Sequence, residues 1–538
     1  MNPTALDVVQ QTLLVLLPEA LILLAAIAMM TAGAFVHLPR RSWARMAAGT
    51  LVVALLVLIL TRGRETVPYA AVALNDALAY YARLIFLLTG LVLLGLAHDQ
   101  VDDARAAEFF GALLMVHAGA MLVATANELV FLFAGLELVS IPTYVLLYLS
   151  HRTASTREAA TKYFFLSIFS SALLLFGLAY LYGLTGVSNL KALAFLLRAD
   201  GPRTPEFGGG DLLTPATLPL GLVAVIFVMA GLGFRVAAVP FHFYAPDVYQ
   251  GSPTVLAALL AWVPKGIGFL AILRTLAAVL CVSNDRLADR AIVVAWVIAA
   301  ATLTLGNTVA LLQEDLKRLL AYSSIAHAGY LMIGVAVAFH HLDDPADPGA
   351  FLGGEAIVFY LITYALMTLG AFGVLLLLGT PERPVERVDD LDGLLWTRPW
   401  PALALILCLF SLAGVPPLAG FWGKFWIFAS AWTSPAPADL PSYQLLAVIG
   451  VLNAAISAYY YLRIVVKMVL SPATERLEAR PAWPTTLAVG ACAALSLGFG
   501  FYPRPIAQAA RQAGVAAIVQ PEPSPAVILT AVPPTPPR

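Results

Sequence analysis

Residues 234–253, FRVAAVPFHFYAPDVYQGSP, decide the fold, because they place a proline, cations and a carboxylate next to long apolar runs. Residues 411–426, SLAGVPPLAGFWGKFW, repeat the arrangement with a proline pair beside a lysine. A transmembrane helix that is interrupted in this way commonly marks a site near the middle of the bilayer. The sequence therefore predicts a membrane protein with two broken helices, one at Pro240 and one at Pro416 and Pro417.

The composition of the 538-residue chain agrees with this prediction. Hydrophobic residues make up 60% and charged residues 12%, so a soluble protein of this length would lack the polar side chains to cover its surface. The formal net charge of −1 provides no basic face, and we expect no nucleic-acid partner. Cys281, Cys408 and Cys492 lie far apart in apolar runs without ligand spacing, so neither a disulfide framework nor a metal site is expected.

Apolar runs of roughly 18 to 26 residues predict an all-α integral membrane fold of about 14 transmembrane helices. The two breaks are five spans apart, an odd number, so they run through the bilayer in opposite directions. That relation predicts two inverted five-helix repeats, each with a broken helix. The expected divisions are an N-terminal three-helix segment (1–100), a first half-channel with helices 4 to 8 (101–282), a second half-channel with helices 9 to 13 (283–470), a last helix (471–502) and a Pro-rich tail (503–538). The expected span centres are near residues 23, 53, 87, 116, 139, 172, 228, 266, 299, 329, 366, 415, 456 and 493.

The distribution of Lys and Arg predicts the orientation of the spans. Loops after odd-numbered helices carry most of these residues and should face the cytoplasm, which places both termini on the periplasmic side. The contrast is weakened by basic residues in other loops, among them Arg62 and Arg64. The cations that set the orientation are Arg40, Arg41, Arg45, Arg152, Arg157, Lys162, Lys317, Arg318, Arg383, Arg387, Arg476 and Arg480.

Few ionisable residues lie inside the apolar spans, and their chemistry should carry the function. Glu137 is roughly 14 Å along its helix and Lys265 roughly 21 Å along its own, so both should lie well inside a 30 Å hydrocarbon core. Arg235 precedes the first break and Lys424 follows the second. A charge at such depth costs at least about 2.5 to 3.5 kcal/mol and persists only where it is paired or solvated internally.

This pattern is typical of a proton relay, since the protonation of a buried amine changes when its hydration or its charged neighbour changes. Glu137, Lys265 and Lys424 are the expected members. The alternative for each is a static ion pair that orients helices. His327 lies in a polar stripe of its helix and is either a link between the lysines or a hydrogen-bonded structural histidine. His242, with Asp247 as its partner, is a candidate for proton uptake at the cytoplasmic mouth.

Five ordered motifs carry a resemblance to a known family. They resemble the proton-pumping, antiporter-like membrane subunits of respiratory complex I, NADH:quinone oxidoreductase, and PDVYQGSP and EAATKYF are similar to the subunit N family in particular. The likeness covers residues 100 to 470. The motifs are LELVSIPTYVL (136–146), EAATKYFFLS (158–167), FRVAAVPFHFYAPDVYQGSPTVLAAL (234–259), EDLKRLLAYSSIAHAGYLMIG (314–334) and LAGVPPLAGFWGKFW (412–426).

The resemblance implies a proton channel in a bacterial cytoplasmic membrane that is driven by quinone reduction elsewhere in the complex. By motif, Glu137 matches the charge-modulating glutamate, Lys265 the central lysine and Lys424 the lysine of the second broken helix. The chain itself should bind no cofactor. NADH, FMN, Fe–S clusters and quinone would be held by partner subunits, while the other membrane subunits, the lipid bilayer and protons would be the partners of this chain.

One position departs from the family pattern, which has a lysine before the first break where this chain has Arg235. An arginine stays protonated, so it can pair with Glu137 but cannot itself pass a proton. Other classes stay open at this stage: a subunit of a multisubunit sodium/proton antiporter, or subunit 2 of a photosynthetic-type complex that reduces plastoquinone. A purely structural subunit would have no need of several lysines at midmembrane. A redox enzyme in its own right is disfavoured, because the sequence has no haem, Fe–S or dinucleotide motif.

Overall fold

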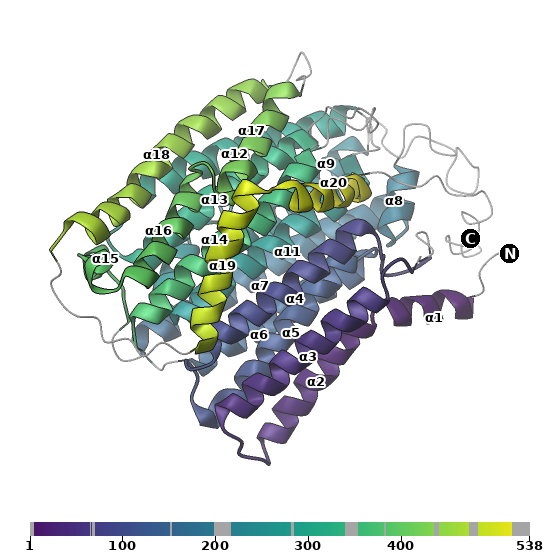
Figure 1. The fold of residues 1–538 in the computed structure, drawn as a ribbon. Coiled ribbons are helices and arrows are strands. Elements are labelled where there is room, and N and C mark those ends of the chain that lie inside the picture. The colour runs from purple at the N-terminus through teal and green to yellow at the C-terminus, as the bar shows by residue number, and fades with distance from the viewer. Residues whose placement is uncertain are drawn as a thin grey trace, which may run out of the picture.

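The computed structural model describes residues 5–64, 66, 70–150, 153–197, 217–280, 285–338, 353–380, 384–434, 441–472 and 483–518. These residues form a bundle of helices (Figure 1), and no strand occurs among them. Four of the cations that were expected to set the orientation lie outside this described part: Arg152, Arg383, Arg476 and Arg480. Cys281 and the last 20 residues also lie outside it. Cys408 and Cys492 are free and buried.

The N-terminal segment consists of four helices. The first two are separated only by Leu16 and are bent by 63° relative to one another. The chain then crosses the bundle twice more. The helices are α1 (Ala5–Val15), α2 (Leu17–Gly33), α3 (Arg40–Leu60) and α4 (Ala77–Ala97).

The next two groups of helices form the body of the bundle. The first group is α5 (Ala106–Thr125), α6 (Leu129–Leu149), α7 (Ala154–Thr185), the short α8 (Leu190–Leu196), α9 (Leu218–Arg235), the short α10 (Ala245–Gly251) and α11 (Thr254–Leu280). The second group is α12 (Asp285–Ala310), α13 (Leu316–Ala338), α14 (Gly353–Leu378), the short α15 (Leu394–Thr397), α16 (Pro399–Ala413), α17 (Ala419–Thr433) and α18 (Tyr443–Leu470). The chain continues into α19 (Trp483–Phe501) and α20 (Arg504–Ile518).

Twelve helices of the described residues are long and apolar enough to cross a membrane, and thirteen if the bent α1–α2 pair is one span. The chain is therefore a multi-pass membrane protein. Thirteen of the fourteen expected centres lie within helices, and the remaining one, at residue 415, lies between α16 and α17. Each of these two helices has 15 residues, too few to qualify as a span on its own.

Both proline segments interrupt the helical chain. α9 ends at Arg235 and α10 begins at Ala245, so Pro240 lies in a non-helical stretch; Pro416 and Pro417 lie between α16 and α17. A residue with left-handed backbone follows the helix that precedes each break. This residue is Ala237 (φ +56°) after α9 and Gly414 (φ +88°) after α16. Gly414 adopts this conformation without steric cost, whereas the Cβ atom of Ala237 makes it unfavourable.

The packing within the two groups corresponds helix by helix. α5 packs on α6 as α12 packs on α13, α7 on α9 as α14 on α16, α10 on α11 as α17 on α18, and α11 on α5 as α18 on α12. α11 and α13 form the centre of the bundle. The most apolar stretch of α11 is completely buried, and 94% of the corresponding stretch of α13 is buried.

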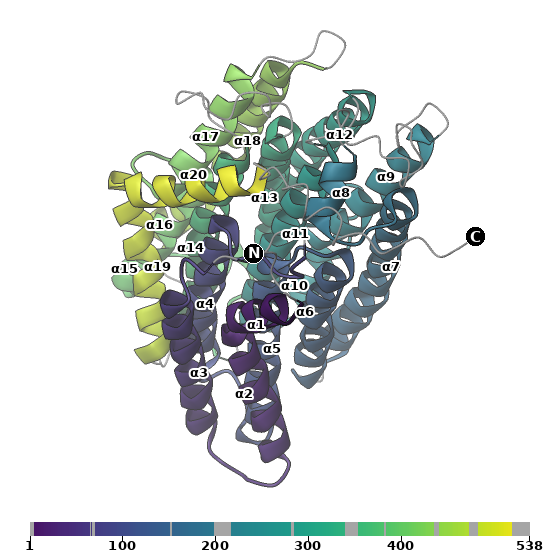
Figure 2. The same cartoon turned by 90° about the vertical axis from the view of Figure 1, so that its right-hand side faces the viewer.

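The last helix differs from expectation, because a Pro-rich tail was expected from residue 503 onward. Residues 504–518 instead form α20, which lies across one end of α4, α11 and α14 (Figures 1 and 2). One face of α20 is buried through Ile506, Ala510, Ala513 and Ala517. The spacing of these residues is that of an amphipathic helix, a signal that the prolines on either side conceal.

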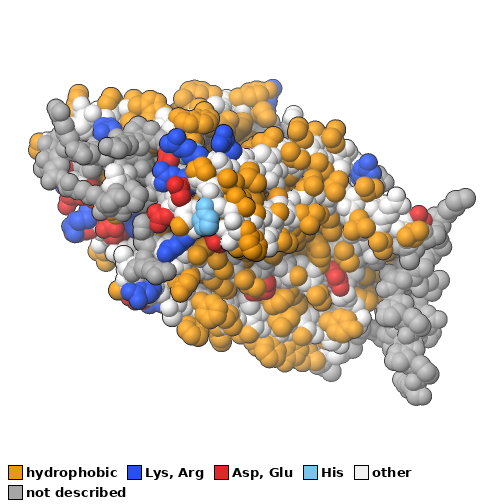
Figure 3. Space-filling model, turned by 90° about the horizontal axis from the view of Figure 1, so that it is seen from below, with side chains coloured by type: hydrophobic (Ala, Val, Ile, Leu, Met, Phe, Trp, Pro, Cys, Tyr) orange, Lys and Arg blue, Asp and Glu red, His pale blue; other side chains and the backbone are white. Residues whose placement is uncertain are grey.

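The outer surface is strongly apolar. Figure 3 shows hydrophobic side chains over much of one face, with the charged side chains gathered toward one region. Large apolar side chains on α3, α7 and α18 are exposed, as expected for helices that contact lipid or other membrane subunits. Examples are Val53, Leu56, Phe165, Phe176, Leu452 and Leu462.

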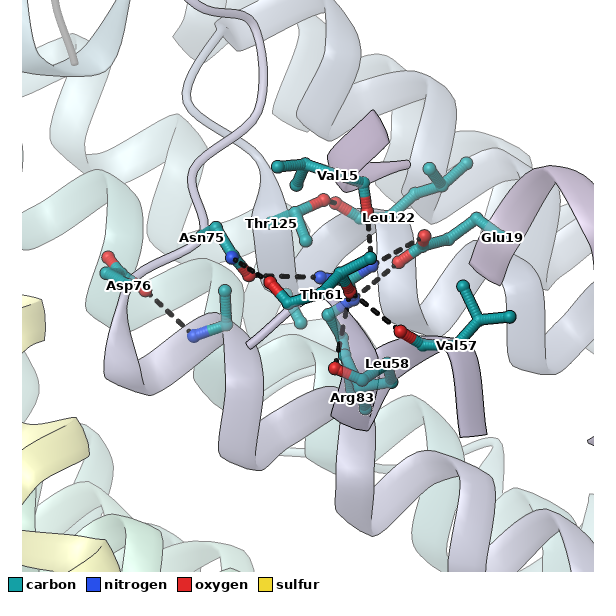
Figure 4. Close-up of polar contacts among 12 residues, drawn as sticks. Val15, Glu19, Val57, Leu58, Thr61, Asn75, Asp76, Arg83, Leu122 and Thr125 are labelled. Atoms are coloured by element: carbon teal, nitrogen blue, oxygen red, sulfur yellow. Dashed lines mark hydrogen bonds and ion pairs between the residues drawn. The ribbon is translucent and has the colours of Figure 1, made fainter. Parts of the chain in front are cut away.

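A buried ion pair that was not predicted holds the N-terminal segment together (Figure 4). Arg83 on α4 has no exposed surface, and its Nε and Nη2 atoms contact the two carboxylate oxygens of Glu19 at 2.7 and 2.8 Å. Arg83 Nη2 also donates to the carbonyl oxygen of Val15 at 2.6 Å, at the end of α1. This arginine therefore fixes the bend between α1 and α2 against α4.

We predict that Arg83→Met lowers the stability of the protein by about 3–5 kcal/mol, because it leaves the Glu19 carboxylate buried without its cation. The measurement is the thermal unfolding midpoint of the detergent-purified protein. Arg83→Met combined with Glu19→Leu should recover most of the loss, since no buried charge is then left unpaired. Arg105→Met, which removes a partly exposed arginine bound to the Leu149 carbonyl, is the control. An Arg83→Met protein as stable as this control would contradict the prediction.

Candidate functional site

Glu137 and Arg235 form an ion pair between α6 and the C-terminal end of α9. Arg235 Nη2 lies 2.8 Å from Glu137 Oε1, and the Ser171 hydroxyl donates to the same oxygen at 2.5 Å. Arg235 Nη1 donates to the Ser140 hydroxyl and to the Leu136 carbonyl oxygen. The pair is joined through one guanidinium nitrogen and not bidentately, and the second nitrogen binds α6 backbone and hydroxyl oxygens.

Lys265 lies at the centre of the bundle, with only 2% of its surface exposed. Its ammonium group donates to the carbonyl oxygen of Ser324 on α13, to the Ser324 hydroxyl at 2.6 Å and to the Tyr364 hydroxyl at 3.4 Å. The same nitrogen lies 4.8 Å from the Tyr364 ring centroid. Among the described residues no carboxylate reaches it, so uncharged oxygens and an aromatic face solvate this amine.

Lys424 occupies a similar environment at the second break. It is 4% exposed, and its ammonium donates at 2.9 Å to the carbonyl oxygen of Ala413, the last residue of α16. The Ser457 hydroxyl lies 3.5 Å away and the ring centroid of Tyr330 4.8 Å away. The C-terminal end of a helix carries a partial negative charge, so the break presents that end to the lysine.

His327 lies between the two lysines, both of which are close enough to act on it electrostatically. Its Nδ1 atom is 2.6 Å from the Tyr360 hydroxyl, and its Nε2 atom is 3.2 Å from the Tyr461 hydroxyl. The tautomer is set by which tyrosine donates. His327 is 1% exposed, and these two tyrosines are its side-chain hydrogen-bond partners among the described residues.

Arg235 and Lys265 are neighbours through their helices. Gly268, one helical turn after Lys265, faces Arg235 so closely that an added Cβ atom would lie 3.5 Å from the Arg235 Cβ and 2.5 Å from a methyl carbon of Val236. Glycine thus allows α9 to contact α11 directly. The structure therefore brings together a row of buried charges from the Glu137–Arg235 pair through Lys265 and His327 to Lys424.

The residues that sequence reasoning missed are the tyrosines of α14 and α18 whose hydroxyl groups contact His327 and the serines of α13. Tyr364 donates to the Ser324 hydroxyl at 2.8 Å, and Ser323 and Tyr461 share a short hydrogen bond. A tyrosine in an apolar helix is usually a packing residue, so its type alone gives no signal. The available signal was spacing, since Tyr360 and Tyr364 are four residues apart on one face of α14.

The predicted partnership of His242 with Asp247 is not formed. Asp247 instead accepts hydrogen bonds from Lys162 on α7 at 2.6 Å and from Arg318 on α13 at 2.7 Å. His242 is half-buried, and its Nδ1 atom has no partner among the described residues. Lys162 also pairs with Glu158 at 2.7 Å.

Asp247 lies outside the membrane-spanning helices, and its charge is fixed by these partners. Partial burial raises the pKa of Asp247, but the hydrogen bonds and charges of Lys162 and Arg318 outweigh it and hold the pKa below its usual value. Burial lowers the pKa of His242. At neutral pH Asp247 is thus an ionised link between α7, α10 and α13.

No group of three or more His, Cys, Asp or Glu side chains in the described part of the chain is arranged to hold a metal ion.

A multi-pass helical bundle with two interrupted helices and a row of buried charges defines an antiporter-like membrane subunit. The family model for the NADH:quinone oxidoreductase/Mrp antiporter transmembrane region matches residues 126–457. The chain belongs to this family and, within it, to subunit N of NADH-quinone oxidoreductase. Subunit N of Trichlorobacter lovleyi is 39% identical over 445 residues, which are 81% of this chain and 83% of that one. Subunit N of Paramagnetospirillum magneticum is 34% identical over 505 residues, 92% of this chain and 96% of that one.

Solved structures agree with the assignment. A chain of respiratory complex I from Thermus thermophilus with bound aureothin is 32% identical, with a TM-score of 0.72 and coverage of 91% of this chain and 98% of that one. The Mrp complex of Dietzia sp. DQ12-45-1b matches with a TM-score of 0.78 at 19% identity, over 97% of this chain and 99% of that one. At that identity the likeness concerns the fold alone.

The Asp247 link generates a prediction about pH. A carboxyl whose folded pKa is lowered contributes stability above its unfolded pKa, about 3.9, and this contribution is lost as the pH falls through the folded value. Asp247→Asn should therefore lower stability by a constant amount between pH 5 and 8, about 1 kcal/mol or less per exposed pair. The difference should shrink only below about pH 4.

The measurement is the thermal unfolding midpoint of the wild-type and Asp247→Asn proteins across this pH range. Glu158→Gln, which removes only the neighbouring pair with Lys162, is the control and should cost less. A wild-type advantage that grows as the pH falls from 8 to 5 would refute the assignment of an ionised Asp247.

Proposed function

We propose that this chain translocates protons as a membrane subunit of NADH-quinone oxidoreductase, from the cytoplasm to the periplasm of a bacterial inner membrane. The observation that carries the proposal is the solvation of Lys265 and Lys424 by hydroxyls, carbonyl oxygens and aromatic rings, with no carboxylate in reach among the described residues. A static structural cation would be expected to have a buried counter-ion. An amine without one can exist in protonated and neutral forms, as a relay requires.

The proton path follows the row of polar groups. In the proposed sequence, protonated Lys265 releases a proton toward His327 through Ser324 and Tyr364, and His327 passes a proton toward Lys424. Tyr360 and Tyr461 hold the imidazole between the two lysines. The first part of this path follows hydrogen bonds, from Lys265 to Ser324 and between Ser324 and Tyr364. The transfers to and from His327 need reorientation of side chains and added water.

The Glu137–Arg235 pair controls the row and does not carry the proton through it. Arg235 stays protonated, so its role is electrostatic, and its four contacts to α6 and α7 fix the guanidinium in place. When the pair is closed, Glu137 neutralises Arg235; when it opens, the free positive charge lies beside α11 and disfavours a proton on Lys265. Opening and closing of this pair would therefore drive proton release.

The rest of the reaction belongs to partner subunits. The family membership supports an assembly in which NADH, FMN, Fe–S clusters and quinone are bound elsewhere and quinone reduction drives this channel. The exposed apolar helices are suited to contact lipid and the neighbouring membrane subunits. The two five-helix groups would act as two inverted half-channels, with both chain termini on the periplasmic side.

We predict that Lys265→Ala lowers proton pumping by about tenfold or more, a barrier increase of about 1.4 kcal/mol or more, while the complex still assembles. The measurement is proton uptake by inverted membrane vesicles, with donor:quinone electron transfer and complex yield measured in parallel. Lys467→Ala, which removes a lysine that pairs with Asp389 at the surface, is the matched control. An assembled Lys265→Ala complex with normal pumping and electron transfer would sink the proposal.

Substitutions of Arg235, the cation that precedes the first helix break, test its role. Arg235→Lys keeps a charge that can pair with Glu137, so pumping should stay within about threefold of wild type, whereas Arg235→Gln should lower it by about tenfold or more. Coupled activity in the same vesicles measures both. Equal activity of the two variants would show that the charge at this position has no part in pumping.

A further inference from the structure

Two arginines hold the same position in the two five-helix groups. Arg274 is the twenty-first residue of α11, the last helix of the first group, and Arg463 is the twenty-first residue of α18, the last helix of the second. Each binds the end of the first helix of its own group. Arg274 Nη2 donates to the Ala124 carbonyl oxygen of α5 at 2.9 Å, and Arg463 donates to the carbonyl oxygens of Leu311 and Gln313, directly after α12.

These contacts use polar groups that a helix end cannot satisfy by itself. The last four carbonyl oxygens of a helix have no partner within the helix, and that end carries a partial negative charge. An arginine is favoured there because it presents five N–H groups and stays protonated. Each guanidinium is therefore a permanent donor that occupies oxygens which would otherwise bind water.

Arg274 is also joined to the N-terminal segment. Its Nη1 and Nη2 atoms donate to the two carboxylate oxygens of Asp76 at 2.5 and 2.8 Å. Asp76 in turn accepts from the backbone N–H of Ala79 in the first turn of α4. Arg274 is 5% exposed, so one buried guanidinium ties the end of α11 to the end of α5 and the start of α4.

The two arginines lie at opposite faces of the membrane. α5 is the fourth span and α12 the ninth, when the α1–α2 pair and the broken α9–α10 helix each count as one. Their ends are five spans apart and therefore on opposite sides. In the proposed orientation, Arg274 lies at the periplasmic face and Arg463 at the cytoplasmic face.

Backbone pairing joins the chain at the same two places. The loop between α5 and α6 pairs with residues 72–74 and with residues 188–190, which follow α7. The loop between α12 and α13 pairs in the same way with residues 386–388, which follow α14. Each pairing uses N–H and carbonyl groups that would otherwise need water.

A buried layer separates each arginine from the lysines of the row. Residues 266–273 of α11, GIGFLAIL, are all buried and apolar and lie between Lys265 and Arg274, which are about 14 Å apart along the helix. On α18, Ser457, which contacts the second buried lysine, lies six residues or about 9 Å from Arg463. Two fully buried tyrosines fill that interval.

We propose that Arg274 and Arg463 are proton seals, side chains that stop passive proton flow at one end of each five-helix group. The proposal rests on the proposed proton translocation. Without the first seal, a proton on Lys265 reaches the periplasm without passing His327. Without the second, a proton on Lys424 returns to the cytoplasm. Both routes bypass the row and discharge the gradient that the complex builds.

The seals act by leaving water no polar group to bind. Loss of Arg274 leaves the Asp76 carboxylate and the Ala124 carbonyl without their donor, and loss of Arg463 does the same to the Leu311 and Gln313 carbonyls. Unpaired buried oxygens attract water, and a chain of water molecules conducts protons. A guanidinium in the same place cannot release a proton, so it interrupts such a chain.

The experiment measures passive proton leak, a quantity that the loss of a relay residue does not raise. Liposomes with the purified, assembled complex receive an acid pulse without an electron donor, and the decay of the pH gradient gives the proton conductance per complex. Arg274→Met and Arg463→Met should each raise this conductance about fivefold or more. With donor present, both should pump fewer protons per donor oxidised, while donor:quinone electron transfer stays at or above the wild-type rate.

Arg105→Met is the matched control. Arg105 also binds the carbonyl oxygen of a helix end, that of Leu149 after α6 at 2.8 Å, but at the face opposite to Arg274. Its removal should leave the conductance unchanged. Arg274→Lys keeps a cation that can bind Asp76 and should leak less than Arg274→Met.

A tight Arg274→Met complex, or a leak of equal size in Arg105→Met, would overturn the proposal. If Arg274→Met does not assemble, Asp76→Asn and Arg463→Met decide, since each weakens one seal; tight complexes of both would overturn it as well.

Lys265→Ala in the same liposomes separates this failure from failure of the proposed function. If Lys265→Ala lowers pumping while the Arg274→Met and Arg463→Met complexes stay tight, translocation stands and the seals are refuted. If Lys265→Ala pumps normally, the proposed function fails and the seals lose the row that they are proposed to protect.

Discussion

The rest of the structure depends on one constraint, which is that amines buried in a hydrocarbon layer have to be solvated by the protein. A charged lysine in lipid is costly, and the usual remedy is a carboxylate partner. Lys265 and Lys424 do not have that remedy among the described residues. Their solvation is built from hydroxyls, backbone carbonyls and aromatic faces on α13, α14 and α16, which have to pack against the lysine-bearing helices α11 and α17 to supply these groups.

The helix breaks follow from the same constraint. A continuous helix uses its carbonyl oxygens internally, whereas the end of α16 leaves the Ala413 carbonyl free to accept from Lys424. At the first break the end of α9 places Arg235 against α6, and its guanidinium takes up the Leu136 carbonyl, two hydroxyls and Glu137. Proline and positive-φ residues are thus found where the backbone has to stop being helical so that a charge can be held.

The sequence was sufficient for the family, the membrane class and most of the span positions, because hydropathy over some 20 residues and five motifs are local signals. It was also sufficient to name Glu137, Arg235, Lys265 and Lys424, since charges in the middle of apolar runs are rare. It could not reveal the Glu19–Arg83 pair, because both residues lie near the polar ends of their runs and meet only in the folded bundle. It could not reveal the tyrosines around His327 either, as α13, α14 and α18 are brought together by packing that leaves no trace in a single sequence.

The asymmetry of the two halves bears on how the chain would work. Glu137 is the ninth residue of α6, and the ninth residue of the matching helix α13 is Ser324, which accepts from Lys265. One half therefore holds a carboxylate against a cation that cannot deprotonate, while the other holds a hydroxyl against an amine that can. On the proposed mechanism, the first half supplies a charge that switches and the second half supplies the groups that exchange protons. Lys265, on the last helix of the first group, then belongs functionally to both, because its backbone packs beside Arg235 while its ammonium is solvated by α13 and α14.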